Sequence, residues 1–211
     1  MLSWLIDLVL HLDRHLVELL AHYDVWVYPI LFAVIFAETG LVVAPFLPGD
    51  SLLFAVGALA AVDTSGTLTA PLASVALGAA AVLGNTVNYS IGRAIGPPAF
   101  SGRYRLLKVE YLWRTEAFFH RHGGLAIVLS RFIPIIRTCA PFVAGVGRMP
   151  YARFLAYNLA GGFGWVLLFV WGGYLFGNVP LVKAHFGLVT LGIIVLSLVP
   201  LAGALLKRTE T

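Results

Sequence analysis

Two long apolar stretches are each interrupted near the middle by proline and glycine, and these interruptions constrain the fold most. The first, residues 27–62, spans about 35 apolar positions, too long for one membrane helix of about 20 residues and too short for two with a loop. Pro45, Pro48 and Gly49 interrupt it. Proline lacks the backbone N–H and clashes with the preceding turn, so a straight helix cannot continue. We therefore expect a re-entrant hairpin of two half-helices, because protein or water must satisfy backbone groups freed at membrane depth.

The second stretch, residues 123–147, repeats this problem with about 25 apolar residues. Pro134 and Pro141 interrupt it, and we predict a second re-entrant hairpin that opens on the cytoplasmic side. The segment Ala-Pro-Phe-Leu-Pro-Gly at 44–49 has a near-copy, Ala-Pro-Phe-Val-Ala-Gly, at 140–145. The residues assigned to the hairpin breaks are Pro45, Pro48, Gly49, Pro134, Pro141 and Gly145.

The composition is typical of an integral membrane protein. Of the 211 residues, 60% are hydrophobic and 11% are charged, whereas a soluble domain carries about 25% charged residues. The apolar runs are continuous, which argues against an outer-membrane barrel with alternating polarity. A single cysteine allows no intrachain disulfide and provides no metal-binding spacing, so we expect no metal and no cofactor. The basic residues lie between apolar segments, the bias of cytoplasmic loops, so the net charge of +4 does not indicate nucleic-acid binding.

These patterns predict a single all-α transmembrane domain with two inverted repeats, each a re-entrant helical hairpin followed by a transmembrane helix. The basic segment 93–121 holds six of the fourteen Lys and Arg residues and is expected in the cytoplasm, as is the C-terminus. The two repeats then have opposite orientations, a recurring architecture among transporters. The predicted parts are an N-terminal amphipathic helix (1–24), repeat 1 (27–95), a cytoplasmic amphipathic linker (96–122), repeat 2 (123–177) and an extra C-terminal transmembrane helix (185–206). The side of the membrane occupied by the N-terminus is left open.

Four ionisable residues, Glu38, Asp50, Arg131 and Arg137, lie inside the two broken stretches. A charge at the bilayer centre costs about 3 kcal/mol, so such residues face a partner or a water-filled cavity. Two interpretations remain open for the arginines. They form a phosphate clamp, because guanidinium groups match phosphate oxygens, or each neutralises one acid and holds the hairpins together.

The two acids and three polar side chains in the apolar spans are further candidates. Glu38 and Asp50 are candidate proton carriers, because burial and a neighbouring arginine shift a carboxyl pKa in opposite directions. Asp50 has a local alternative as the cap of a half-helix beginning at the next residue. Asn88, Tyr89 and Asn158 are assigned to a secondary polar lining, with interhelical hydrogen bonding as the alternative role.

Several ordered motifs resemble the DedA family of the VTT-domain superfamily. They are Phe-Ala-Glu-Thr-Gly-Leu at 36–41, the segments 45–53, 88–93, 131–137 and 141–145, and the residues Phe154, Asn158, Gly161 and Trp165. The resemblance covers roughly residues 25–180. It implies a bacterial inner-membrane protein associated with membrane homeostasis, undecaprenyl phosphate recycling, lipid scrambling in eukaryotic relatives and maintenance of the proton-motive force. The positions required for function in the family correspond to Glu38, Asp50, Arg131 and Arg137. Asn85 stands where many members carry Asp.

The first functional hypothesis is a flippase for an anionic lipid carrier, undecaprenyl phosphate, coupled to the proton-motive force. The expected partners are membrane lipids, the polyprenyl phosphate and protons, with a homo-oligomer among the options for the assembly. The alternatives are a proton-coupled exporter of small cations or drugs, a phospholipid scramblase and a purely structural role. A polyprenyl pyrophosphate phosphatase is disfavoured, because Ser51 and Ser130 have no base at a recognisable spacing. We therefore expect no enzyme activity.

Overall fold

A computed structural model describes residues 24–40, 49–101 and 109–180, together with 182, 189 and 192. Every regular element in these ranges is helical, which confirms the predicted all-α class. The elements are η1 (Asp24–Trp26), α3 (Val27–Gly40), α4 (Gly49–Ala60), α5 (Ala70–Ile95), η2 (Pro97–Ser101), α6 (Val109–His122), η3 (Gly123–Leu125), α7 (Ala126–Ser130), α8 (Pro134–Val146) and α9 (Tyr151–Phe176). The predicted N-terminal helix, the C-terminal span, Pro45 and Pro48 lie outside the described residues, apart from single positions.

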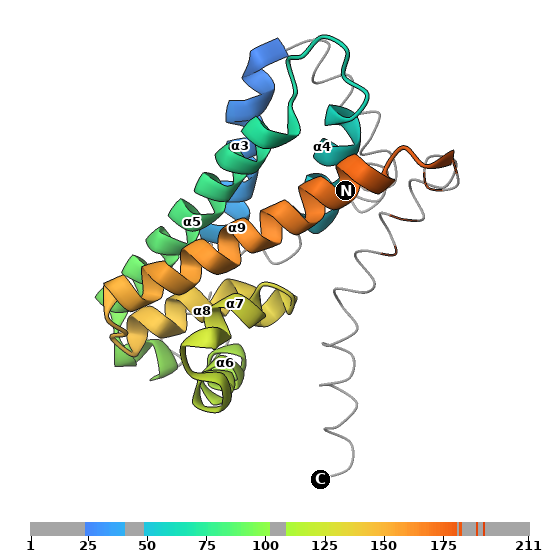
Figure 1. Ribbon diagram of the computed structural model, residues 1–211. Coiled ribbons are helices and arrows are strands. Elements are labelled where there is room, and N and C mark those ends of the chain that lie inside the picture. The colour runs from blue at the N-terminus through green and yellow to red at the C-terminus, as the bar shows by residue number, and fades with distance from the viewer. Residues whose placement is uncertain are drawn as a thin grey trace, which may run out of the picture.

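The two long helices, α5 and α9, are long and apolar enough to cross a membrane. They match the transmembrane helices expected at the ends of the segments 27–95 and 123–177. Thr69 is extended and a proline follows within the first turn of α5, where a missing N–H is harmless. The two helices pack along one another and run in opposite directions (Figure 1).

Four shorter helices surround this pair in a reciprocal arrangement. Helices α3 and α7 each pack against the long helix that follows in their own half of the chain, α5 and α9 respectively. Helices α4 and α8 cross over, so that α4 packs against α9 and α8 packs against α5. The pair α3 and α4 lies toward one end of the long helices, and the pair α7 and α8 lies toward the other (Figure 1).

Glycines allow the two crossed contacts to be close. A Cβ added at Gly57 of α4 would lie 1.9 Å from a backbone oxygen of α9, and one at Gly173 of α9 would lie 1.9 Å from a backbone oxygen of α4. The α5–α8 contact repeats this with Gly92 and Gly145, where each added Cβ would lie 2.1 Å from a backbone oxygen of the facing helix. Small residues permit this approach in membrane helices, and any side chain here would force the helices apart.

The interruption in the second apolar stretch, residues 123–147, lies in only part of the region expected. Helix α7 ends at Ser130, residues 131–133 form a turn, and Pro134 begins α8, where its missing N–H is not needed. Helix α8 continues through Pro141 and Gly145, so assigning the break to these two residues was wrong. Neighbouring helices re-satisfy the backbone around a proline in the membrane, and the glycine provides close contact with α5. The glycines that end the two near-copies therefore occupy different positions, since Gly49 begins a helix and Gly145 lies within one.

The turn between α4 and α5 is ordered by Asp63. Its carboxylate accepts hydrogen bonds from the Ser65 hydroxyl (2.6 Å) and the Leu68 N–H (2.7 Å). These bonds favour the charged form and hold the pKa of Asp63 below its usual range. The Thr67 hydroxyl donates to Asp24 over 2.8 Å, which ties the turn to the start of the first hairpin.

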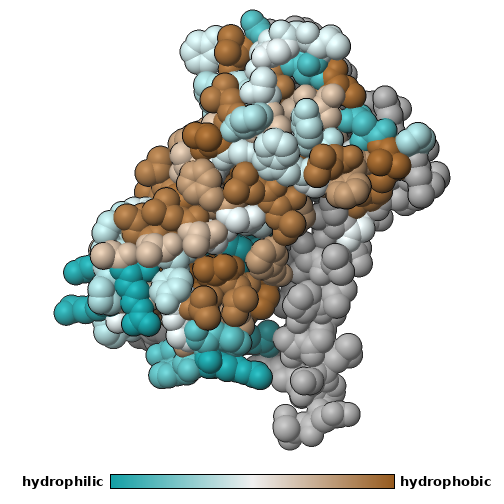
Figure 2. All heavy atoms as spheres, viewed as in Figure 1, coloured by the Kyte–Doolittle hydropathy of each residue, from teal (hydrophilic) through white to brown (hydrophobic). Residues whose placement is uncertain are grey.

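The described surface has an apolar band and a polar end. Figure 2 shows hydrophobic residues along α9 and hydrophilic residues gathered at the end of the molecule near α6. Helix α6 is amphipathic as predicted, with Leu112 buried and Trp113 exposed. The exposed large apolar side chains of α9 are Tyr151, Leu159, Leu167, Leu168, Trp171, Tyr174, Leu175 and Phe176. A large exposed apolar surface of this kind indicates a face that contacts lipid or protein.

Candidate functional site

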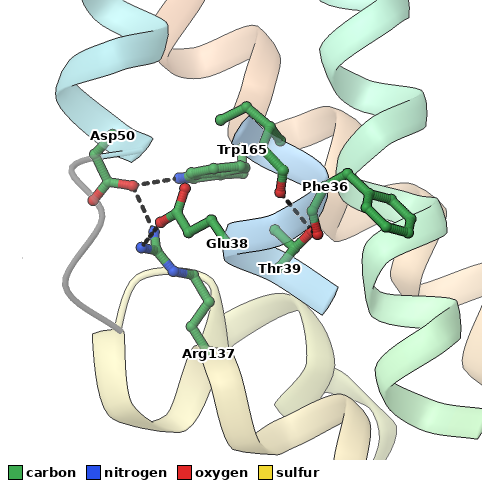
Figure 3. A network of polar contacts seen from close by, with 7 residues as sticks. Phe36, Glu38, Thr39, Asp50, Arg137 and Trp165 are labelled. Atoms are coloured by element: carbon green, nitrogen blue, oxygen red, sulfur yellow. Dashed lines mark hydrogen bonds and ion pairs between the residues drawn. The ribbon is translucent and has the colours of Figure 1, made fainter. Parts of the chain in front are cut away.

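Arg137 connects α8 to α3 and α4 through two buried ion pairs. Its Nη2 donates to Glu38 Oε1 over 2.5 Å and its Nη1 donates to Asp50 Oδ1 over 2.6 Å (Figure 3). Glu38 lies near the end of α3, Asp50 lies in the first turn of α4 and Arg137 lies in the first turn of α8. All three are buried. One guanidinium on α8 therefore holds both α3 and α4, and we call Glu38, Asp50 and Arg137 the ion triad.

Trp165 of α9 completes the triad. Its indole N–H donates to Asp50 Oδ1 over 2.8 Å (Figure 3). The ring also lies near both arginines, with its centre 5.2 Å from Arg137 Cζ and 5.6 Å from Arg131 Cζ, within the range of cation–π attraction. Trp165 belongs to the motifs that resemble the DedA family, but no role at the site was predicted for it. The available signal was its position inside a span, where a buried indole N–H needs an acceptor.

Arg131 is in a different position from Arg137. It lies in the turn between α7 and α8, is 1% exposed, and has no carboxylate within 4.0 Å among the described residues. Its Nη2 donates to Asn158 Oδ1 over 3.1 Å and, at 3.5 Å, to the Ala81 carbonyl. Within the described ranges, Nε and Nη1 have no hydrogen-bond partner. The structure therefore differs from the interpretation in which each arginine neutralises one acid.

Asn158 holds the Arg131 guanidinium and is itself held on both sides. Its Oδ1 accepts a hydrogen bond from Asn85 Nδ2 over 2.9 Å, and its Nδ2 donates to the Val82 carbonyl over 2.9 Å. Both asparagines are buried at the α5–α9 contact. Asn85 was singled out only for its difference from the family pattern, yet it donates a hydrogen bond to Asn158, the residue that contacts Arg131.

Asn88 and Tyr89 are neighbours in sequence with different surroundings. Asn88 Nδ2 donates to the Thr39 carbonyl of α3 (3.3 Å) and to the Thr138 carbonyl of α8 (2.9 Å), so α5 holds α3 and α8 beside the ion triad. The Tyr89 hydroxyl instead donates to the Met149 carbonyl, and its ring stacks on Phe154 with centres 4.3 Å apart. Asn88 and Asn158 thus belong to the polar cluster, and Tyr89 stabilises the junction before α9.

Gly49→Ala is expected to disturb the triad directly. A Cβ at this position would lie 1.9 Å from Glu38 Oε2 and 2.6 Å from its Cδ, so the carboxylate must move away from Arg137. We expect a loss of about 1–3 kcal/mol of stability from this overpacking, measured by thermal unfolding in detergent. Gly164→Ala is the control, because no atom lies within 4 Å of its added Cβ. Equal unfolding midpoints for the two variants would contradict the tight contact.

Comparison with known proteins identifies the family. The chain is 51% identical over 201 residues to Protein DedA of Escherichia coli strain K12, an alignment that covers 95% of this chain and 91% of that protein. Residues 47–175 match the VTT domain. The chain belongs to the DedA family. The resemblance stated from the sequence motifs is therefore confirmed.

Other relatives of this DedA-family chain are also named as membrane proteins. It is 41% identical over 173 residues to a membrane protein of Mycobacterium leprae, covering 82% of this chain and 76% of the relative. It is 37% identical over 183 residues to the inner membrane protein YghB of Escherichia coli strain K12, covering 86% and 79%. No solved structure gives a significant match. These names and the two apolar helices support a bacterial inner membrane protein.

Proposed function

We propose that this DedA-family protein is a flippase that moves undecaprenyl phosphate across the cytoplasmic membrane. The observation that carries the proposal is the fully buried Arg131 guanidinium, which has donors without partners in the described structure and lies near the same tryptophan as the ion triad. Guanidinium groups bind phosphate oxygens through several charge-assisted hydrogen bonds. Only the headgroup has to enter such a site, because the isoprenoid tail can stay in the lipid that contacts the apolar band.

The reciprocal packing supports an alternating-access mechanism. In our proposal, residues 27–95 and 123–177 are inverted repeats whose re-entrant hairpins meet near the membrane midplane. Each hairpin contributes one helix to the other repeat, because α4 packs against α9 and α8 packs against α5. The ion triad is then the contact that must rearrange when the site closes on one side of the membrane and opens on the other.

Glu38 and Asp50 are the proposed proton carriers. Each carboxylate accepts a hydrogen bond from Arg137, and a carboxyl group that gains a proton loses the ion pair. Protonation of either acid would therefore weaken the contact between α8 and the first hairpin. This gives the proton-motive force a direct means of shifting the hairpins.

The test is binding of undecaprenyl phosphate to the purified protein. We expect saturable binding to the wild type and affinity lower by about tenfold or more in Arg131→Lys, since lysine keeps the charge and loses the planar fork. Arg153→Lys is the control, because Arg153 is exposed at the start of α9. Affinities are compared at equal thermal stability. The absence of saturable binding to the wild type would overturn the proposal.

The exporter and enzyme alternatives have less support. A cation exporter would use Glu38 and Asp50 as ligands, and Arg137 already occupies an oxygen of each. A phosphatase would need an activated nucleophile, and the Ser130 hydroxyl donates to the Ile127 carbonyl of its own helix over 2.8 Å. We therefore propose transport without a catalytic step.

A further inference from the structure

We infer that the two arginines have separate tasks: Arg131 receives the anion, and Arg137 has Glu38 and Asp50, not the anion, as its partners. This inference rests on the proposed function, and it refines it by assigning the phosphate contact to a single residue. Nothing in the sequence distinguishes the two arginines, since both lie in one short segment of the second hairpin. In the structure they differ in their hydrogen-bond and ion-pair partners.

Arg137 is a poor receptor because its terminal nitrogens are already used. Nη1 and Nη2 each donate to a different buried carboxylate. A phosphate that displaced either acid would exchange one anionic partner for another and leave a buried carboxylate without its counterion. That exchange is unfavourable, since an uncompensated buried charge is strongly destabilising. Arg137 therefore suits a connection between the hairpins that is made through the two acids and not through the anion.

Arg131 can accept an anion without breaking an ion pair among the described residues. Its Nη2 is oriented by Asn158, and its Nε and Nη1 are the donors without partners. Nε and Nη1 lie on different edges of the planar guanidinium, so an acceptor oxygen of an anion can bind to either of them. A phosphate monoester has three such oxygens on one tetrahedral group. Because Arg131 is fully buried, the hairpins must move for the headgroup to reach it.

The same geometry makes Arg131 dispensable for folding. If Arg131 is replaced by methionine, Asn158 Oδ1 still accepts the hydrogen bond from Asn85, so no acceptor is left without a donor. A buried cation with unused donors is also removed, and such groups are costly to bury. Replacing a residue that stabilises the fold would lower the unfolding temperature. The unfolding temperature of an Arg131 variant therefore distinguishes a binding role from a structural one.

The experiment measures thermal unfolding and ligand binding for five proteins: the wild type, Arg131→Met, Arg131→Lys, Arg137→Met and Arg137→Lys. The probes are undecaprenyl phosphate in nanodiscs and inorganic phosphate. We expect Arg131→Met to unfold at or above the wild-type temperature, to bind at least tenfold more weakly, and to lose the ligand-induced rise in unfolding temperature. We expect Arg137→Met to unfold well below the wild type. Arg137→Lys, assayed where it is folded, should bind within about threefold of the wild type, because the phosphate contact is elsewhere.

The outcomes separate the inference from the proposed function. Lipid binding that falls equally in Arg131→Lys and Arg137→Lys, or an Arg131→Met protein that unfolds as early as Arg137→Met, would overturn the division of tasks and leave the flippase proposal standing. Binding of inorganic phosphate that requires Arg131, without binding of the lipid, would support the anion site and overturn the flippase proposal. If neither probe binds the wild type, both ideas are wrong.

Discussion

Replacing Arg137 by methionine is expected to lower the free energy of unfolding by about 3–5 kcal/mol. Glu38 and Asp50 are both buried, and each would lose the ion pair that compensates its charge. Trp165 would still donate to Asp50, but one neutral hydrogen bond does not replace a guanidinium. The measurement is thermal or denaturant unfolding of the purified variant in a defined detergent. The effect should be among the largest of any single substitution in the chain.

A compensated variant gives this prediction its control. Adding Glu38→Gln and Asp50→Asn to Arg137→Met removes the two orphaned charges, and it should recover a large part of the lost stability. Arg153→Met tests the loss of a positive charge from an exposed position and should change stability by less than about 0.5 kcal/mol. If Arg137→Met is no less stable than Arg153→Met, the ion triad does not stabilise this state.

The candidate residues could be found from the sequence because their chemistry conflicts with their surroundings. Glu38, Asp50, Arg131 and Arg137 interrupt apolar runs beside proline and glycine, and the cost of a charge in the membrane makes such residues conspicuous. The two long helices were also predictable, since continuous apolar length fixes a span within a few residues. Both results depend only on local composition.

The pairing of these charges could not be predicted in the same way. Glu38 and Arg137 are separated by 99 positions, and they meet because α3 and α8 pack against the same long helix, α5. The hairpin break was misplaced at Pro141 because a local motif looked repeated, whereas the helix there continues against Gly92 of α5. Asn85 and Trp165 were overlooked for the same reason: each acquires its role from a partner on a different helix.

The two crossed helix contacts link packing to the charge cluster. Asp50 lies in α4 and its partner Trp165 lies in α9, so the distance between these helices sets the hydrogen bond between the two residues. Gly57 and Gly173 set that distance. Close packing of small residues is therefore a condition for the buried charges to meet. A substitution that separates α4 from α9 should also disturb the charge cluster.

Gly173→Ala tests this connection and is expected to cost about 3 kcal/mol of stability. Its Cβ would lie 1.9 Å from the Phe54 carbonyl oxygen and 3.0 Å from the Ala58 amide nitrogen. These are backbone atoms of α4, which cannot move aside by changing a side-chain rotamer, so the whole helix must shift away from α9. Asp50 would move with it, away from the indole N–H of Trp165.

The preceding residue provides a matched control in the same helix. An added Cβ at Gly172 has no atom within 4 Å, so Gly172→Ala should leave packing unchanged and gain up to about 1 kcal/mol from helix propensity. Thermal unfolding of the two variants side by side removes differences in expression, detergent and helix content. A lower midpoint for Gly173→Ala alone would establish that the α4–α9 approach is tight. Similar midpoints for both would mean that α4 can move away from α9 at little cost, and the buried charges would then have to keep their contacts without this packing.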